Sequence, residues 1–219
     1  MAFSLTVTLD VAGRRAVVVG GGHEAVARVG ALLHGDAEVV VVTPDPDPEL
    51  TAHAAAGRIV LERRGWQPGD LVGAFVAYVT REDDTPVEAT WAEATEHRVL
   101  LSTLDDIPRC HFATPSIVRR GDLAITIATA GRAPALAKRL RRKLEVELGE
   151  VYAELVDVLD EARQACLPRP VPFPEWAARW ERALEDLDGL VALVDHGHRD
   201  EARDRVITAL RTPTGAGAT

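Results

Sequence analysis

The run of residues 15–25 constrains the fold of this chain more than any other stretch of its sequence. A continuous apolar segment, Ala16–Val19, stops at three consecutive glycines, and apolar residues then recur at helical spacing. This order predicts a strand, a tight turn and a helix. A second β-branched segment, Glu38–Val42, follows at the distance that a βαβ unit requires. The chain is therefore predicted to begin with an α/β nucleotide-binding unit.

The glycine cluster fits the pattern Gly20-x-Gly22-x-x-Ala25, which is typical of dinucleotide-binding turns. Gly20 permits the turn, Gly22 lets a pyrophosphate approach the backbone and the helix N-terminus, and Ala25 allows close helix–strand packing. His23 and Glu24 lie within the pattern and are included in the predicted cofactor site. The alternative is a glycine-rich turn that only redirects the chain.

The end of the second strand is the usual place for a carboxylate that holds the adenosine ribose. Here the strand ends in Thr43-Pro44-Asp45, so Asp45 lies slightly beyond that place and is the candidate, with Pro44 beside it. No arginine follows directly, which favours NAD over NADP. Thr80 ends a further buried segment, residues 74–79, and is predicted at the same ligand-binding edge.

Alternating strand and helix patterns continue over the first hundred residues and predict a mostly parallel, doubly wound sheet of Rossmann type. A short alternating segment, residues 3–9, predicts an extra strand ahead of it. Residues 116–128 predict two strands around a Gly-Asp turn, and Pro134 then opens a helix. From about Gly149 the periodicity is helical.

The composition excludes several classes of function. A formal net charge of −9 argues against nucleic-acid binding, which requires a basic surface. No apolar run reaches the roughly 20 residues that cross a bilayer, so no membrane segment is expected. Cys110 and Cys166 form no C-x-x-C motif, which fits a reduced cytoplasmic compartment and indicates neither a zinc site nor a disulfide framework. We predict no metal site, with His196-x-His198 as a weak candidate.

A polar segment, residues 102–108, leaves the last predicted strand of the sheet at its ligand-binding edge. A carboxylate there is placed to act as a general base or to orient a substrate. The alternative is that Asp105 or Asp106 only caps a turn.

Several segments together resemble the NAD-dependent precorrin-2 dehydrogenase module of sirohaem synthases. The similarity runs in order over roughly residues 3–148. After the short N-terminal segment, it is carried by five stretches: Val17–Gly22, Leu104–Asp106, Phe112–Ser116, Arg119–Ile125 and Ala130–Arg141.

The resemblance implies three domains in a cytoplasmic homodimer. These are an NAD-binding Rossmann domain (1–112), a small α+β dimerisation domain (113–148) and a C-terminal helical domain (149–219). It implies NAD-dependent oxidation of precorrin-2 to sirohydrochlorin in sirohaem or cobalamin synthesis. It also implies the stand-alone form, because the chain is too short for the methyltransferase domain of some members.

The resemblance also assigns roles to individual residues. Counting back from Phe112-x-x-Pro-Ser places the aspartate that the family needs for activity at Asp105. The substrate implied by the resemblance carries many carboxylates. Four basic residues therefore gain a role as anion contacts: Arg119, Arg120, Arg132 and Lys138.

Three departures from the family pattern keep alternatives open. The family commonly has Asn at the positions of Ser102 and of the segment 86–88, which includes Glu88, and Ser at the position of Ala133. The first alternative is a bifunctional enzyme that also inserts ferrous iron. The second is a non-catalytic sensor of NAD or a tetrapyrrole, and the third is a generic small-molecule reductase.

Overall fold

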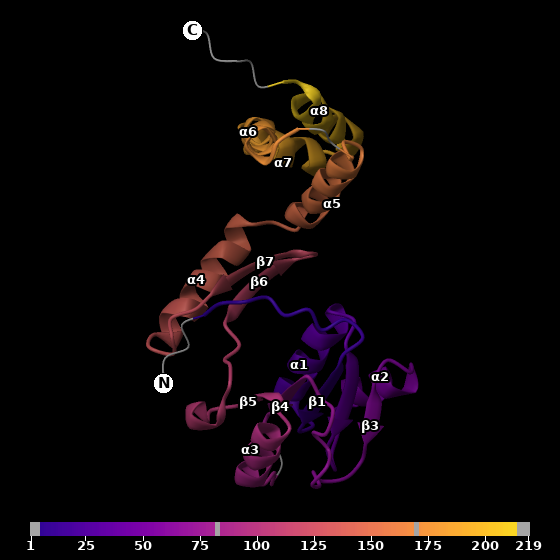
Figure 1. The fold of residues 1–219 in the computed structure, drawn as a ribbon, viewed down its shortest axis with the longest axis vertical. Helices are drawn as coiled ribbons and strands as arrows, with labels where there is room; N and C mark the ends of the chain where they lie inside the picture. Colours follow the sequence, from indigo (N-terminus) through magenta and orange to yellow (C-terminus); the bar gives the residue numbers. More distant parts are fainter. Residues whose placement is uncertain (1–4, 82–83, 169–170, 214–219) are drawn as a thin grey trace. The chain divides into compact units, whose positions relative to one another are not determined.

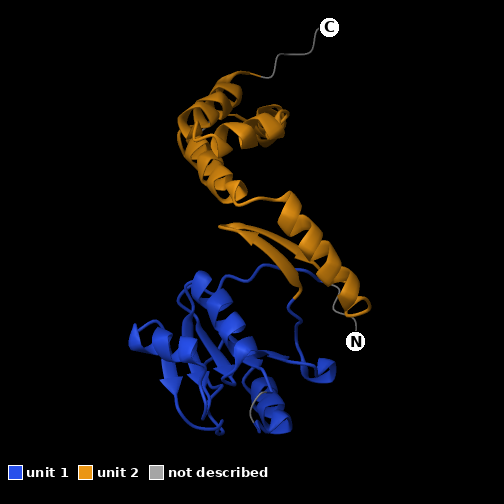
Figure 2. Ribbon diagram, turned by 180° about the vertical axis from the view of Figure 1, so that it is seen from behind, with its two compact units in different colours: residues 1–114 blue, residues 115–219 orange. Residues whose placement is uncertain are grey.

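The computed structural model describes residues 5–81, 84–168 and 171–213. It divides into two compact units, residues 1–114 and 115–219 (Figure 2). Each unit has its own hydrophobic core and is described by itself. The division of the chain into three domains stays a prediction.

The first unit alternates strands and helices around one parallel sheet (Figure 1). Its elements are β1 (Arg15–Val19), α1 (His23–His34), β2 (Glu38–Val42), α2 (Pro48–Ala55), β3 (Val60–Glu62), β4 (Val76–Val79), α3 (Val87–Glu96), β5 (Leu100–Thr103) and the 3-10 turn η1 (Ile107–Arg109). The strand order is β3-β2-β1-β4-β5. This order confirms the doubly wound Rossmann-type sheet, and it reverses between β1 and β4, which is where such sheets bind ligands.

Both faces of this sheet are buried, which explains why its strands are continuous apolar runs. Successive side chains of a strand point to opposite faces. Ala16 and Val18 pack with residues of α1, whereas Val17 and Val19 pack with residues of α3. All four side chains are at most 1% exposed. The central strand β1 therefore holds the glycine loop that follows it in a fixed place.

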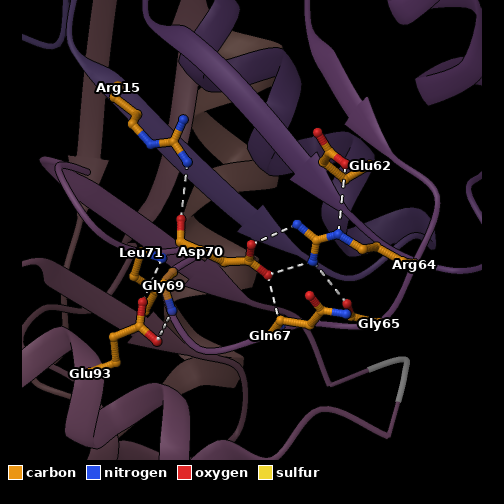
Figure 3. A network of polar contacts seen from close by, with 9 residues as sticks. All are labelled: Arg15, Glu62, Arg64, Gly65, Gln67, Gly69, Asp70, Leu71 and Glu93. Atoms are coloured by element: carbon orange, nitrogen blue, oxygen red, sulfur yellow. Dashed lines mark hydrogen bonds and ion pairs between the residues drawn. The ribbon is translucent and has the colours of Figure 1, made fainter.

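The connection from β3 to β4, residues 63–75, is a loop held by a polar network (Figure 3). Arg64 donates to both carboxylate oxygens of Asp70, at 2.8 and 2.7 Å. The backbone N–H of Gln67 donates to the same carboxylate, and the Arg15 guanidinium donates to the Asp70 carbonyl. The hydrogen bond from Arg64, followed by that from Gln67, lowers the pKa of Asp70.

A second carboxylate ties this loop to α3. Glu93 is only 9% exposed, and it accepts hydrogen bonds from the N–H groups of Gly69 (3.0 Å) and Leu71 (2.8 Å) (Figure 3). A buried carboxylate is stable when backbone donors satisfy it. Nothing in the sequence pattern distinguished Glu93 from the other charged residues of that helix.

The second unit begins with an antiparallel hairpin and continues entirely in helices (Figure 1). Its elements are β6 (Ser116–Arg120), β7 (Leu123–Ile127), α4 (Pro134–Glu147), α5 (Val151–Gln164), α6 (Phe173–Ala183), α7 (Leu187–Asp195) and α8 (Arg199–Arg211). The hairpin turns at Gly121, whose φ of +55° favours glycine. The predicted hairpin and the helix that opens at Pro134 are both confirmed.

Two arginines of α6 stabilise the C-terminal end of α8. Arg179 is 6% exposed and donates to the carbonyl of Leu210, and Arg182 donates to the carbonyls of Ala209 and Thr212. The last carbonyls of a helix have no partner within it, so cationic donors satisfy them and complement the helix dipole.

Within the described ranges, no helix combines the length and the apolar character needed to cross a membrane.

The prediction of a strand over residues 3–9 is wrong for the residues that the structure describes. Residues 3 and 4 lie outside the described part of the chain, and residues 5–9 form no strand. Leu5 and Val7 are 84% and 60% exposed, so most of their apolar surface is not packed against other described residues. A strand needs a neighbour for its backbone hydrogen bonds, and pattern alone does not supply one.

Candidate functional site

The carboxyl ends of the strands bring the predicted cofactor residues to one edge of the sheet. The strand register aligns Val19 with Val42 on one side and with Val79 on the other. The residue after each strand continues the ladder: Gly20 donates to Val42, and Thr80 donates to Val19, both at 3.0 Å. The glycine loop, the end of β2 and the end of β4 therefore lie side by side. We call this edge the ligand edge.

The glycine loop has the geometry that the motif predicts. Gly20 has a φ of +129°, a conformation that favours glycine. Gly22 is the N-cap of α1, which begins at His23, and no side chain caps it. Ala25 is fully buried against the sheet, so only a small residue fits there. Glu24, in the first turn, pairs with Arg28 at 3.0 Å.

Gly21 is a sterically constrained position in the candidate site that the motif analysis missed. A Cβ at Gly21 would lie 2.3 Å from the carbonyl oxygen of Asp45 and 2.4 Å from Oγ1 of Thr43. The Gly21 carbonyl also accepts a hydrogen bond from the N–H of Asp47 at 2.8 Å. The glycine loop and the β2–α2 loop are thus in direct backbone contact. The run of three glycines was the only sequence signal for this packing.

The end of β2 presents its carboxylate to solvent. Thr43 is fully buried, and its Oγ1 accepts a hydrogen bond from the N–H of Asp45. Pro44 and Asp45 are exposed. Asp45 therefore has the position that a ribose contact needs, and that role stays a prediction.

A small pocket lies beside the glycine loop, between α1 and the ends of β4 and β5. Its lining is mostly polar and consists of Glu24, Arg28, Tyr78, Val79, Thr80, Ser102 and Leu104. Burial raises the pKa of the Tyr78 phenol. Thr80, a predicted cofactor residue, and Ser102, at which the sequence departs from the family pattern, thus line the same pocket.

The structure separates the two carboxylates of the Asp105-Asp106 pair. Asp105 has a φ of +56°, a left-handed conformation in which Asp and Asn are enriched, and its side chain is exposed. Asp106 accepts two hydrogen bonds from Arg109, at 3.1 and 3.0 Å, and its side chain is 13% exposed. Of these two aspartates, only Asp105 is therefore available to a ligand at this edge. The sequence alone did not distinguish the two.

The segment after Asp106 is anchored to the end of β5. The Sγ of Cys110 accepts from the N–H of Thr103 and donates to carbonyl oxygens. The N–H of His111 donates to the carbonyl of Leu101, while its Nδ1 accepts from the N–H of the same residue. These bonds fix both ends of the loop that carries Asp105.

The four predicted anion contacts all lie in the second unit, and they differ in availability. Arg119, Arg132 and Lys138 are exposed. Arg120 instead donates to the carbonyls of Glu145 and Leu148 at the end of α4. The structure thus gives Arg120 a structural role, and the other three remain the better candidates for binding carboxylates.

No group of three or more His, Cys, Asp or Glu side chains suited to a metal ion occurs among residues 5–81, 84–168 and 171–213. In the weak candidate, Nδ1 of His196 lies 2.7 Å from the carbonyl oxygen of Ala192, and His198 is the N-cap of α8. The His196 ring thus contacts the helix that precedes it, and the pair stays a weak candidate.

Comparison with known proteins places these features in a family. Residues 7–116 match the profile of a family described as putative NAD(P)-binding, and residues 120–147 match the profile described as sirohaem biosynthesis protein central.

Similar curated proteins are sirohaem synthases. Siroheme synthase 1 of Serratia proteamaculans is 30% identical over 91% of this chain, and siroheme synthase of Thioalkalivibrio sulfidiphilus is 33% identical over 91%. The matched parts cover 41% and 40% of those proteins, so this chain spans about two fifths of their length.

The fold is shared with a solved structure named SirC, precorrin-2 dehydrogenase. The TM-score is 0.66 at 24% sequence identity, and the alignment covers 94% of this chain and 98% of the other.

Proposed function

We propose that this chain, which belongs to the NAD(P)-binding family matched by residues 7–116, is an NAD-dependent precorrin-2 dehydrogenase. Residues 120–147 also match the central region of sirohaem biosynthesis proteins. The observation that carries the proposal is the succession of the two matched regions in one chain. A nucleotide-binding sheet is followed directly by a domain of sirohaem biosynthesis. The reaction transfers a hydride from precorrin-2 to NAD and releases a proton, and sirohydrochlorin is the product.

The glycine loop and the end of β2 are the proposed cofactor site. The residues fit a dinucleotide, because Gly20 makes a turn with a φ that favours glycine and α1 begins directly after Gly22. Bound NAD supplies the hydride acceptor. The exposed carboxylate of Asp45 is placed to accept hydrogen bonds from ribose hydroxyls and to repel the extra phosphate of NADP. Thr80 lines the same edge from β4.

Asp105 is the proposed proton acceptor. It is the exposed carboxylate of the pair that follows β5, and the adjacent carboxylate is already bonded to Arg109. A carboxylate beside the macrocycle accepts the proton that is lost when the hydride leaves. Arg119, Arg132 and Lys138 are proposed to bind substrate carboxylates, because they are exposed cations in a chain that is acidic overall.

The test is anaerobic incubation of the purified protein with enzymatically made precorrin-2 and NAD, followed by the absorbance of NADH and of the macrocycle. NADH formation together with sirohydrochlorin is the expected result. Ferrous ion added afterwards tests the bifunctional alternative, which requires metal insertion faster than in the absence of protein. Binding of NAD and precorrin-2 without NADH formation would contradict the dehydrogenase and favour the sensor.

We also propose that the protein is a cytoplasmic homodimer formed through the second unit. On α4, Leu136, Leu140 and Val146 are 51%, 39% and 84% exposed in the single chain, and the adjacent hairpin has only two strands. Exposed apolar side chains of this kind mark interaction surfaces. Light scattering should give about twice the chain mass of 23.6 kDa. A monomer at micromolar concentration would contradict the proposal.

A further inference from the structure

The side chain of Arg109 contacts two carboxylates from different elements. Its Nη1 donates to both carboxylate oxygens of Asp106, and its Nη2 pairs with Glu88 in the first turn of α3. Within the described residues, its guanidinium thus connects the loop after β5 with the helix that follows β4. Both segments leave strands at the ligand edge.

The same two elements are joined a second time by an aromatic contact. The ring of His111 stacks on that of Trp91 in α3, with centroids 4.5 Å apart and an interplanar angle of 25°. The loop 104–111 is therefore attached to α3 on one side and to β5 on the other. Asp105 lies near the start of this loop with a positive φ, a conformation that costs energy in a non-glycine residue unless its surroundings stabilise it.

We propose that Arg109 is a positioning residue for the reaction: by holding Asp106 and Glu88, it keeps Asp105 in its left-handed conformation as the exposed carboxylate of the pair. The inference rests on the proposed function. In its absence, Asp106 would be free to turn toward the ligand and the backbone at Asp105 would relax. The proton acceptor would then be displaced relative to the macrocycle.

The chain offers a control pair of similar exposure. Arg64 forms a bidentate pair with Asp70, and the exposed fractions of the two side chains are 34% and 12%. For Arg109 and Asp106 the fractions are 31% and 13%. The Arg64 pair lies in the β3–β4 loop, outside the proposed cofactor and proton-acceptor residues. Loss of either arginine should affect folding similarly, and only loss of Arg109 should affect Asp105.

The experiment compares Arg109→Ala, Arg109→Lys and Arg64→Ala with the wild type in two independent measurements. The first is turnover of precorrin-2, with kcat and KM determined separately, alongside NAD affinity by calorimetry. The second is the set of backbone chemical shifts of Asp105 in isotope-labelled protein, which report its left-handed conformation without any substrate. Thermal unfolding of each variant shows that it is folded.

Arg109→Ala should lower kcat by about tenfold to a hundredfold, the range expected from a small misplacement of a catalytic group, with unchanged NAD affinity. Its Asp105 shifts should leave the left-handed range. Arg109→Lys, which keeps the charge but not the planar fork, should recover part of the loss. Arg64→Ala should match the wild type in both measurements.

Unchanged Asp105 shifts in Arg109→Ala would overturn the proposal, and so would an equal loss of turnover in Arg64→Ala. If the wild type itself does not oxidise precorrin-2, the proposed function fails. The chemical shifts then decide the role of Arg109 on their own.

Discussion

Two Arg–Asp pairs of nearly equal exposure, Arg64–Asp70 and Arg109–Asp106, have different consequences in this protein. In the β3–β4 loop, the Asp70 carboxylate also accepts from a backbone N–H, and its carbonyl accepts from Arg15, so the network ends in backbone groups (Figure 3). At the ligand edge, Asp106, the partner of Arg109, lies between the exposed residues Asp105 and Ile107. The Arg64–Asp70 pair therefore stabilises the β3–β4 connection, whereas the Arg109–Asp106 pair leaves Asp105 as the available carboxylate.

The largest expected effect is the loss of turnover on substitution of Asp105, which belongs to neither Arg–Asp pair. Asn tolerates a left-handed backbone as well as Asp does, so Asp105→Asn should keep the loop and remove only the proton acceptor. Turnover of precorrin-2 should fall by about 100-fold to 10,000-fold, the usual contribution of a general base. NAD affinity measured by calorimetry should stay within experimental error of the wild type.

Asp106→Asn is the companion variant for this prediction. It keeps a hydrogen-bonding group for Arg109, so turnover should fall much less than in Asp105→Asn. A larger loss in Asp106→Asn would reverse the assignment of the two aspartates.

The next effect concerns backbone packing at the ligand edge. Gly21→Ala places a methyl group against the backbone of Asp45, which must shift. We expect a loss of about 1 to 3 kcal/mol in the free energy of unfolding, as for overpacked sites, together with weaker NAD binding. Urea unfolding and calorimetry measure the two quantities.

Gly30→Ala in α1 is the control, because a Cβ there meets nothing within 4 Å. It should stabilise the protein by about 0.5 to 1 kcal/mol through helix propensity. Equal stability of the two variants would show that Gly21 is not sterically required.

A smaller effect is expected for the pair in the β3–β4 loop. Asp70→Asn removes the charge that receives the hydrogen bonds of Arg64 and Gln67. Because the group is partly exposed, we expect a loss of about 1 to 2 kcal/mol in the free energy of unfolding at neutral pH. Turnover per folded molecule should not change. A loss of turnover comparable to that of Arg109→Ala would remove the contrast between the two pairs.

The smallest effect is the pH dependence of that stability. The pKa of Asp70 is lowered in the folded protein, so its carboxylate stabilises the fold above the unfolded pKa of about 3.9. This contribution is lost as the pH falls through the folded pKa. The difference in unfolding free energy between wild type and Asp70→Asn should be constant from pH 7 to 5 and shrink below about pH 4. A difference that grows on acidification would contradict the sign of the shift.

Sequence pattern predicted the elements of the sheet because both of its faces are buried. The β-branched runs of β1 and β2 and the glycine cluster between them are local features, and local sterics determine their conformation. The hairpin around Gly121 and the helix opened by Pro134 were predictable for the same reason. The extra strand over residues 3–9 was not, because a strand is defined by a partner that lies elsewhere in the chain.

The sequence by itself determined the fold class, and it predicted a place for the cofactor site and a choice of two aspartates after β5. The tertiary structure decided that Gly21 contacts Asp45, that Arg120 holds the end of α4, and that Arg109 sequesters Asp106. Each of these facts joins residues that are separated by a turn, a strand or a helix. Spacing and periodicity describe one element at a time, whereas hydrogen bonds and steric exclusion between elements depend on how the chain is folded.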